Sequence, residues 1–428
     1  MRRAFSQQGF PRLFTAISTS MFGDSLMLIV LGIWVKSLTG SNAAAGMTFF
    51  WLAIPSLMAP LAGLYIDRVR RKPLLVWSNL ASGLLVLPLI FVRDASQVWV
   101  IYVVAFFYGI SFVVIPAGLN GLLKEVMPEE MLVDANSSLQ TMKESFRLIG
   151  PLAGAALFAG FGGGAVAVLD AVSFLVAAAV IRSLKVVEDV PESSEQHWRQ
   201  EMTEGIRHIV GEPLLKHTLV ALGLCILVLG FSESLIFAVA DAFGKPVEYI
   251  GFMLTIQGAG AIAGGLTAPR FVRRLGETGA LTLSLAVLAL GLAVIAVAPT
   301  LWLVLVGVAI FGYSLPLMMI AFSTLMQLRT PGRLMGRVST ATDVVLGTPQ
   351  TLSIAAGALL VTHFSYRSLF AVMASVTTLA VIYLLISLRG HLFRPDTPLT
   401  SAPVEPAPPP PHLRLSGGGL IRSRGSWR

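Results

Sequence analysis

The stretch Gly63-Leu-Tyr-Ile-Asp-Arg-Val-Arg-Arg-Lys72 decides the fold of this chain. It joins the end of one long apolar segment, residues 43–66, to the start of another, residues 73–92. A glycine, one carboxylate and four cations in so short a connection cannot face lipid, so the connection lies at a membrane surface. Its dense Lys and Arg content marks that surface as the cytoplasmic one.

The composition is that of a polytopic membrane protein. Of the 428 residues, 55% are hydrophobic and 13% are charged, whereas a soluble chain carries about 25% charged residues. The formal net charge is +8, but the cations cluster between apolar runs. Orientation in the bilayer therefore explains them better than nucleic acid, and we expect no nucleic-acid partner. Cys225 is the single cysteine, which excludes an intrachain disulfide.

About 20 largely apolar residues are needed to cross a bilayer. Twelve segments meet that requirement, at roughly 13–37, 43–66, 73–92, 97–123, 138–160, 164–183, 214–240, 249–271, 279–298, 301–326, 338–362 and 366–388. If both termini are inside, the outer connections hold only Lys36, Arg93, Lys245 and Arg367. This asymmetry predicts a multi-pass protein of the cytoplasmic (inner) membrane with both termini cytoplasmic. The short basic N-terminus is interpreted as the start of an uncleaved first helix.

The long polar connection at 184–213 divides the segments into two sets of six. We expect an N-terminal six-helix bundle (1–183), a cytoplasmic linker (184–213), a C-terminal six-helix bundle (214–390) and a disordered, Pro-rich cytoplasmic tail (391–428). Apolar residues recur in the linker at helical spacing, namely Trp198, Met202, Ile206, Ile209 and Val210. They predict an amphipathic helix along the inner membrane surface, either a tether or a regulatory element.

An internal repeat supports this division. Gly265-Leu-Thr-Ala-Pro-Arg-Phe-Val-Arg-Arg274 repeats the pattern of the 63–72 stretch about half a chain later, with Pro269 where Asp67 stands. Duplicated halves that rock around a central cavity are a common design of secondary transporters.

The pattern Gly-x-x-x-Asp-Arg-x-x-Arg-Lys resembles the loop between helices 2 and 3 of the major facilitator superfamily. The resemblance implies an all-α integral membrane fold of 12 transmembrane helices in two pseudo-symmetric six-helix bundles. It also implies a cytoplasmic gate, whose Asp engages the start of helix 11. A carboxylate at a helix N-terminus gains about 0.3–1 kcal/mol. The matching residues are Gly63, Asp67, Arg68, Arg71 and Lys72. The alternative is that these are only positive-inside charges.

A second motif is Arg147-Leu-Ile-Gly150-Pro151-Leu-Ala-Gly154. It resembles the helix 5 motif of drug and proton antiporters of this superfamily, which is thought to seal the interface between the halves against leak. The alternative is a generic seam of small residues. With the weaker signals Ala135-Asn136, Glu204-Gly205 and Gly336-Arg337, the chain resembles most the branch of macrolide-efflux and enterobactin-exporter proteins, over about residues 10–390. One departure is Ala105, which stands where many proton-coupled antiporters carry an Arg four residues before a Gly, here Gly109.

Acids inside apolar segments are the remaining functional candidates. Asp24, in the middle of the first segment, and Glu233, in the seventh, are the proton or substrate candidates. A charge in the bilayer costs at least about 2.5–3.5 kcal/mol, so each acid should face a cavity or a partner. A carboxyl group in a low-dielectric cavity is readily held neutral, and it could exchange a proton for a substrate. Asp170 and Asp343 are weaker candidates. Any of the four could instead be structural.

No motif indicates catalysis. The six histidines show no metal-ligand spacing, and there is no nucleotide-binding glycine loop, so we expect no cofactor, no metal and no enzyme activity. The sequence predicts a monomeric, proton-coupled exporter of a small, moderately hydrophobic molecule such as a drug or a siderophore-like metabolite. An importer of a nutrient or lipid on the same fold, and a non-transporting membrane receptor, remain as alternatives.

Overall fold

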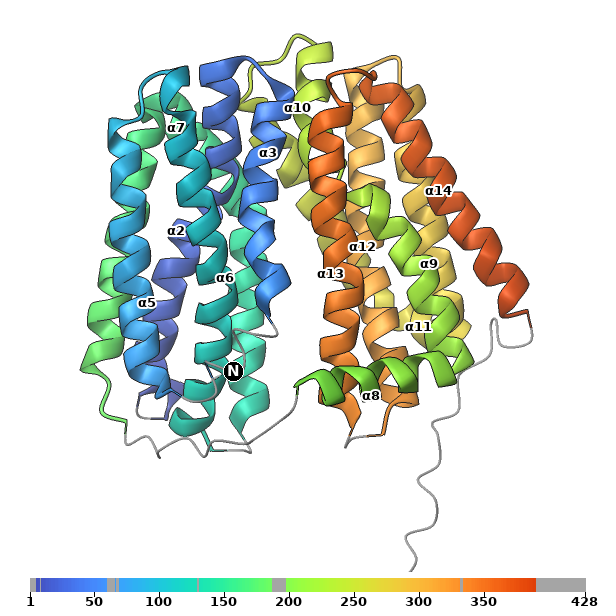
Figure 1. Ribbon diagram of the computed structural model, residues 1–428, viewed down its shortest axis with the longest axis horizontal. Coiled ribbons are helices and arrows are strands. Elements are labelled where there is room, and N and C mark those ends of the chain that lie inside the picture. Colours follow the sequence, from blue (N-terminus) through green and yellow to red (C-terminus); the bar gives the residue numbers. More distant parts are fainter. Residues whose placement is uncertain are drawn as a thin grey trace, which may run out of the picture.

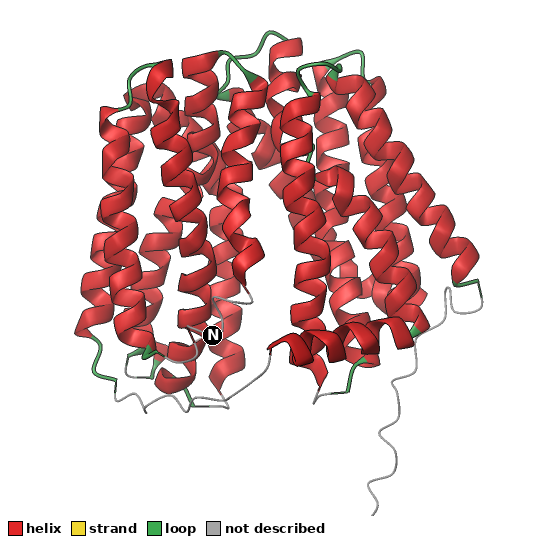
Figure 2. Cartoon of the chain, in the orientation of Figure 1, coloured by secondary structure: helices red, strands yellow, loops and turns green. Residues whose placement is uncertain are grey.

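The computed structural model describes residues 5–7, 9–59, 66, 69–128, 131–186, 198–331 and 334–389. That part of the chain is helical and contains no strand (Figure 2). The Pro-rich tail and residues 187–197 of the linker lie outside the described residues.

The helices form two bundles that stand side by side (Figure 1). The first bundle contains α2 (Phe10–Thr39), α3 (Asn42–Ala53) with the 3-10 turn η1 (Ile54–Met58), α5 (Arg71–Val86) with η2 (Leu87–Phe91), η3 (Ala95–Gln97), α6 (Val98–Val126) and α7 (Leu132–Ser183). Helix α8 (Trp198–Gly211) lies across one end of the second bundle. The second bundle contains α9 (Pro213–Leu229), α10 (Ser232–Ala242), α11 (Tyr249–Val297), α12 (Leu301–Arg329), α13 (Met335–Leu360) and α14 (Tyr366–Ser387).

Two of these helices are each two segments joined at a glycine. At 52 residues, α7 would extend about 78 Å as one straight helix, far more than the roughly 30 Å core of a bilayer. It reverses at Gly162 (φ 76°), and α11 reverses in the same way at Gly276 (φ 71°). Both φ values lie in the left-handed region that glycine adopts without strain.

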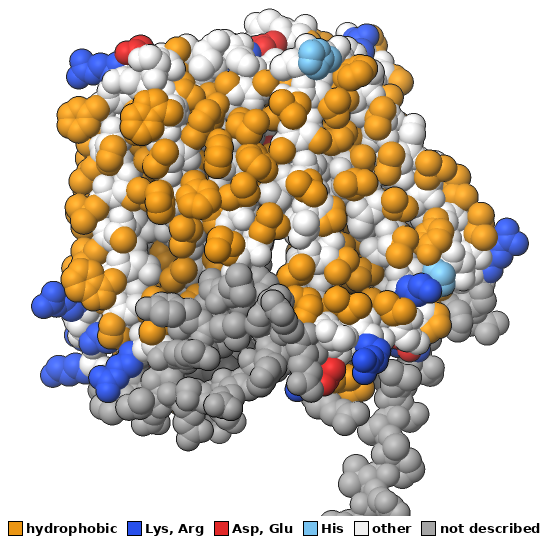
Figure 3. Space-filling view, in the orientation of Figure 1, with side chains coloured by type: hydrophobic (Ala, Val, Ile, Leu, Met, Phe, Trp, Pro, Cys, Tyr) orange, Lys and Arg blue, Asp and Glu red, His pale blue; other side chains and the backbone are white. Residues whose placement is uncertain are grey.

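The described helices account for twelve membrane-crossing segments. Eight helices are long and apolar enough to cross a membrane, and among them are the doubled helices α7 and α11. The shorter pair α3 and η1, and the pair α9 and α10, supply the other crossings. On the face shown in Figure 3, charged side chains gather toward the two ends of the molecule, and the surface between them is largely hydrophobic. The fold is therefore that of an all-α, multi-pass membrane protein.

The two bundles share an apolar core at one end only. A buried cluster of the first bundle, which includes Leu31 and Phe49, also takes in Phe237, Ala240 and Ile250 of the second. This is the end that carries α10, the upper end in Figure 1. The cluster at the opposite end, where α8 lies, draws only on the first bundle. The large cluster of the second bundle draws only on that bundle and on Ile209 and Met202 of α8. Among the described residues, the bundles are thus packed together toward the α10 end and not toward the α8 end.

Candidate functional site

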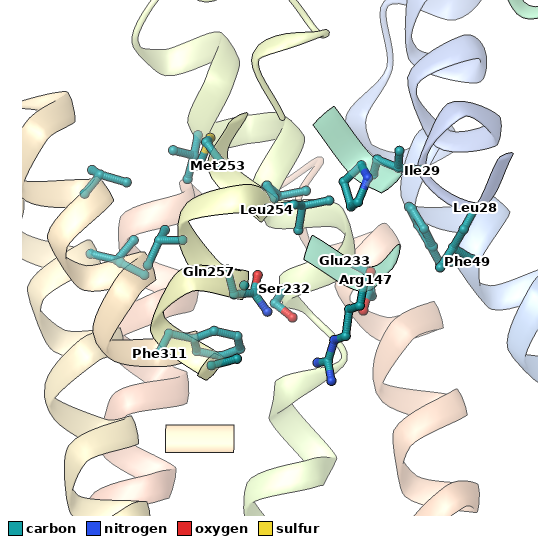
Figure 4. Close-up of a pocket in the computed structure, with 18 of the residues that line it drawn as sticks. Leu28, Ile29, Phe49, Arg147, Ser232, Glu233, Met253, Leu254, Gln257 and Phe311 are labelled. Atoms are coloured by element: carbon teal, nitrogen blue, oxygen red, sulfur yellow. The ribbon is translucent and has the colours of Figure 1, made fainter. Parts of the chain in front are cut away.

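A cavity of about 280 Å³ lies where the two bundles meet (Figure 4). The first bundle lines it through α2, α3 and α7, and the second through α10, α11, α12 and α14. Most of its wall is apolar, and its polar or charged members are Ser25, Arg147, Ser232, Glu233 and Gln257. A mostly apolar wall with a few polar groups is typical of sites for small organic molecules.

The two charged residues of the cavity come from opposite bundles. Arg147 belongs to α7, and its guanidinium lies 3.8 Å from the Glu144 carboxylate on the same helix. Glu233 is half-buried in the first turn of α10. It follows an interruption at Gly230 and Phe231, which separates α9 from α10. Interrupted transmembrane helices form binding sites in many transporters, because they bring backbone dipoles and polar side chains to a cavity.

The glycines of the helix 5 motif allow α7 to approach its neighbours closely. A Cβ atom at Gly150 would lie 2.5 Å from the Ser25 Cβ, and one at Gly154 would lie 2.6 Å from the Leu26 carbonyl oxygen. Both contacts are to α2, within the first bundle. Pro151 contacts the other bundle, since its carbonyl oxygen would lie 2.6 Å from a Cβ atom at Gly251 of α11. The motif therefore lies at the interface between bundles and beside the cavity.

The loop predicted to act as a gate is described only in part. Gly63, Asp67 and Arg68 lie outside the described residues. Arg71 donates a hydrogen bond to the carbonyl oxygen of Ile66. Lys72 Nζ donates to the carbonyl oxygen of Leu184, at 2.6 Å. Arg71 and Lys72 thus bind backbone of the first bundle at the α8 end.

Asp24 does not line the cavity but contacts a partner inside the first bundle. The Tyr108 hydroxyl oxygen of α6 lies 2.6 Å from Asp24 Oδ1 and 3.0 Å from Asp170 Oδ2 of α7. Asp170 is fully buried, whereas Asp24 is half-buried and precedes the cavity residue Ser25. Asp24 and Asp170, predicted separately, therefore meet at one hydroxyl group, and Glu233 is not part of this group.

Tyr108 was missed as a functional residue by the sequence interpretation. The available signal was a tyrosine in the middle of a long apolar segment, because a buried phenol usually has a hydrogen-bond partner. Asp343 joins neither group. It is exposed on α13 and does not line the cavity between the bundles. Within the described ranges, no three His, Cys, Asp or Glu side chains are placed to hold a metal ion.

Twelve crossings in two bundles around a shared cavity define a polytopic transporter. The chain belongs to the Major Facilitator Superfamily, whose family model matches residues 13–349. It is therefore a membrane transporter rather than an enzyme.

Three known proteins illustrate the likeness. The chain is 27% identical over 357 residues to an uncharacterised MFS-type transporter, YfiS, of Bacillus subtilis (strain 168), with 79% of this chain and 84% of that protein covered. The nucleoside transporter NupG has a TM-score of 0.72 at 12% identity, covering 89% of this chain and 99% of that chain. A bacterial homologue of the iron transporter ferroportin in the inward-facing state has a TM-score of 0.69 at 18% identity, covering 88% and 98%. The outward-facing structure of such a ferroportin homologue has a TM-score of 0.58 at 18% identity, covering 89% of this chain and 99% of that chain. At these identities, the likeness to solved structures concerns the fold alone.

Proposed function

We infer that this transporter is a proton-coupled exporter of a small, moderately hydrophobic molecule. The observation that carries the proposal is the cavity between the bundles, which combines an apolar wall with one cation, Arg147, and one acid, Glu233. Such a wall suits an amphipathic substrate that bears a hydrogen-bonding or cationic group. The helix 5 motif, with its resemblance to antiporters, favours export over import.

The proposed orientation places the α8 end in the cytoplasm, because most Lys and Arg residues lie in the connections at that end. The bundles are packed together at the other end, so this conformation is inward-facing. Substrate would enter the cavity from the cytoplasm and leave once the α10 end opens.

In this cycle Asp24 exchanges a proton, and Glu233 receives the polar group of the substrate. The loop 63–72 stabilises the outward-open state by docking its Asp67 at the start of α13. Retained gating after Asp67→Asn would remove that role from the loop.

The test is accumulation of ethidium, a fluorescent lipophilic cation, in efflux-deficient cells that express this chain. The expected result is low ethidium accumulation that rises when a protonophore is added. In Asp24→Asn, accumulation should be the same with and without the protonophore. Accumulation that stays high with or without the protonophore contradicts export of lipophilic cations. Deletion of residues 395–428 should leave export intact, whereas a receptor that signals through its tail would lose its output.

A further inference from the structure

We propose that Asp24, Tyr108 and Asp170 form a proton-binding unit in which Asp170 keeps a resident proton and Asp24 takes up and releases a second one. The proposal rests on the proposed proton coupling and deepens it, because it adds two residues that act through Asp24. The unit lies between α2, α6 and α7, inside the first bundle, and is separate from the substrate cavity.

The hydrogen bonds of Tyr108 require a proton on one of the two acids. Its hydroxyl oxygen contacts Asp24 Oδ1 at 2.6 Å and Asp170 Oδ2 at 3.0 Å. Both distances are within the range of O–H···O hydrogen bonds. A phenol carries one hydrogen and can donate only once, and an ionised carboxylate cannot donate at all. The second contact is therefore a hydrogen bond only if that carboxyl group is protonated and donates to the phenol oxygen.

The surroundings place this proton on Asp170. Asp170 is fully buried, and its second oxygen, Oδ1, has no hydrogen-bond partner among the described residues. A buried carboxylate oxygen without a hydrogen bond costs much free energy. The same missing hydrogen bond costs less at the carbonyl oxygen of a neutral carboxylic acid. Asp24 makes the shorter contact, at 2.6 Å, which is the length of a charge-assisted O–H···O⁻ bond. Asp170 therefore donates to Tyr108, and Tyr108 donates to an ionised Asp24.

Neither carboxyl group takes part in an ion pair in the part of the chain that the structure describes. Arg147 lines the cavity together with Ser25, but its ion pair is with Glu144. Of the other helices packed against α2, α6 and α7, α3 contains no acid or base, and the charged residues of α5 are Arg71 and Lys72 at its first turn. The charged residues of α11 lie around its reversal at Gly276, at Arg270, Arg273, Arg274 and Glu277. Ser173 neighbours the Asp170 carboxyl group, but its single hydroxyl hydrogen is donated to the Asp170 carbonyl oxygen at 2.8 Å. The titratable groups of the unit are thus the two acids and Tyr108.

The geometry separates the roles of the two acids. Asp24 is half-buried, so water can reach part of this residue and deliver a proton to it. Asp170 is closed off by Gly23 of α2, where a Cβ atom would lie 2.4 Å from Asp170 Oδ1. Asp170 is therefore a positioning residue, because it holds the Tyr108 hydroxyl in the orientation that donates to Asp24. Binding of the second proton to Asp24 makes the unit neutral, and its release restores one negative charge.

Infrared difference spectroscopy of the purified full chain tests this assignment without any substrate. Protonated carboxyl groups have a carbonyl band that carboxylates lack. We expect a band present across the pH range that Asp170→Asn removes, and a second, pH-titrating band that Asp24→Asn removes. Tyr108→Phe should shift the pH at which the second band titrates. It should not change the infrared band of Glu233, which is identified by its loss in Glu233→Gln.

The Asn variants also separate the two roles in transport. An Asn amide at position 170 can donate to Tyr108 as the protonated acid does, so Asp170→Asn should keep the titrating band of Asp24 and reduce proton-dependent efflux less than Asp24→Asn, which should lose it. A resident band that survives Asp170→Asn, or that sodium or a divalent cation removes at constant pH, would overturn the proposal. A titrating band that Tyr108→Phe does not shift would also overturn the proposal. This second test remains available if Asp170→Asn does not fold. Failure of ethidium export with all infrared results as expected would instead reject the proposed function and leave the unit standing.

Discussion

Lys36 and Asp241 join the two bundles at the α10 end, where Lys36 Nζ lies 2.5 Å from Asp241 Oδ2. Lys36 belongs to α2, and Asp241 belongs to α10. The Lys36 side chain is only 10% exposed, and its Nζ also donates to the Gly40 carbonyl oxygen at 2.8 Å. The pair therefore holds the end that must open when a transporter of this fold releases substrate on the other side.

Breaking this ion pair should make the α10 end open more often. Partly exposed pairs contribute about 0.2–1 kcal/mol, so Lys36→Ala should raise the open population by up to about fivefold. The measurement is labelling of a cavity cysteine, Ser232→Cys in a Cys225→Ser background, by a membrane-impermeant maleimide from the α10 side. The exchanged pair Lys36→Asp with Asp241→Lys should restore slow labelling. An equal increase in Lys245→Ala, whose cation lies over the Tyr249 ring of its own bundle, would contradict the account.

A side chain at Gly46 should also favour the opposite conformation. A Cβ atom there would overlap Ser234 of the other bundle, whose Cα lies 3.2 Å away. Since packed backbone cannot give way cheaply, Gly46→Ala should separate α3 from α10, at a cost to the present conformation of about 1–3 kcal/mol. Spin labels on the two bundles should report a longer mean distance. Gly223→Ala is the control, because nothing lies within 4 Å of its Cβ position, and its distances should not change.

The thermal stability of the protein should depend on the contact of helix α8 with α13. Glu204 forms an ion pair with Arg337, and a Cβ atom at Gly205 would lie 2.4 Å from the Arg337 carbonyl oxygen. Gly205→Ala should therefore lower the thermal unfolding midpoint in detergent, by an amount that corresponds to about 1–3 kcal/mol. Gly211→Ala, on the same helix with an open Cβ position, should leave the midpoint nearly unchanged. Equal midpoints for the two variants would show that α8 is not held at Gly205.

Removing the charge of Glu233 should weaken export of cationic substrates. A hydrogen bond to a charged group contributes about 1.5–3 kcal/mol, so Glu233→Gln should reduce the apparent affinity for ethidium by about 10- to 150-fold. The measurement is the ethidium concentration that half-saturates efflux. Asp343→Asn provides the matched control, because this acid is exposed on α13 and does not line the cavity. If both variants behave like the parent chain, Glu233 does not contact the substrate.

The fold could be predicted because apolar length and Lys/Arg placement are local properties of the chain. The connection expected between the segments at 138–160 and 164–183 is present as the reversal of α7 at Gly162. The interruption of the seventh segment at Gly230 and Phe231 was not predicted. The sequence is continuously apolar there, so it does not show where the helix is interrupted. Gly230 allows α13 to approach closely, because a Cβ atom at this position would lie 2.6 Å from the Ile354 backbone nitrogen.

The candidate site could be predicted only as separate residues. Depth in the membrane follows from position along a segment, but the direction in which a side chain points depends on helix rotation and packing. Tyr108 is 84 residues from Asp24 and 62 from Asp170, so no local pattern brings them together. The contact of Glu204 with Arg337, 133 residues apart, is hidden for the same reason.

The most direct test of proton-linked alternating access is the distance between spin labels on the two bundles at the α10 end. Ser37→Cys and Ala242→Cys, both at exposed positions, would carry the labels in a Cys225→Ser background for double electron–electron resonance. The account predicts a short and a long population whose ratio changes with pH and no longer does so in Asp24→Asn. A single population that pH leaves unchanged, or a pH response that survives Asp24→Asn, would contradict it.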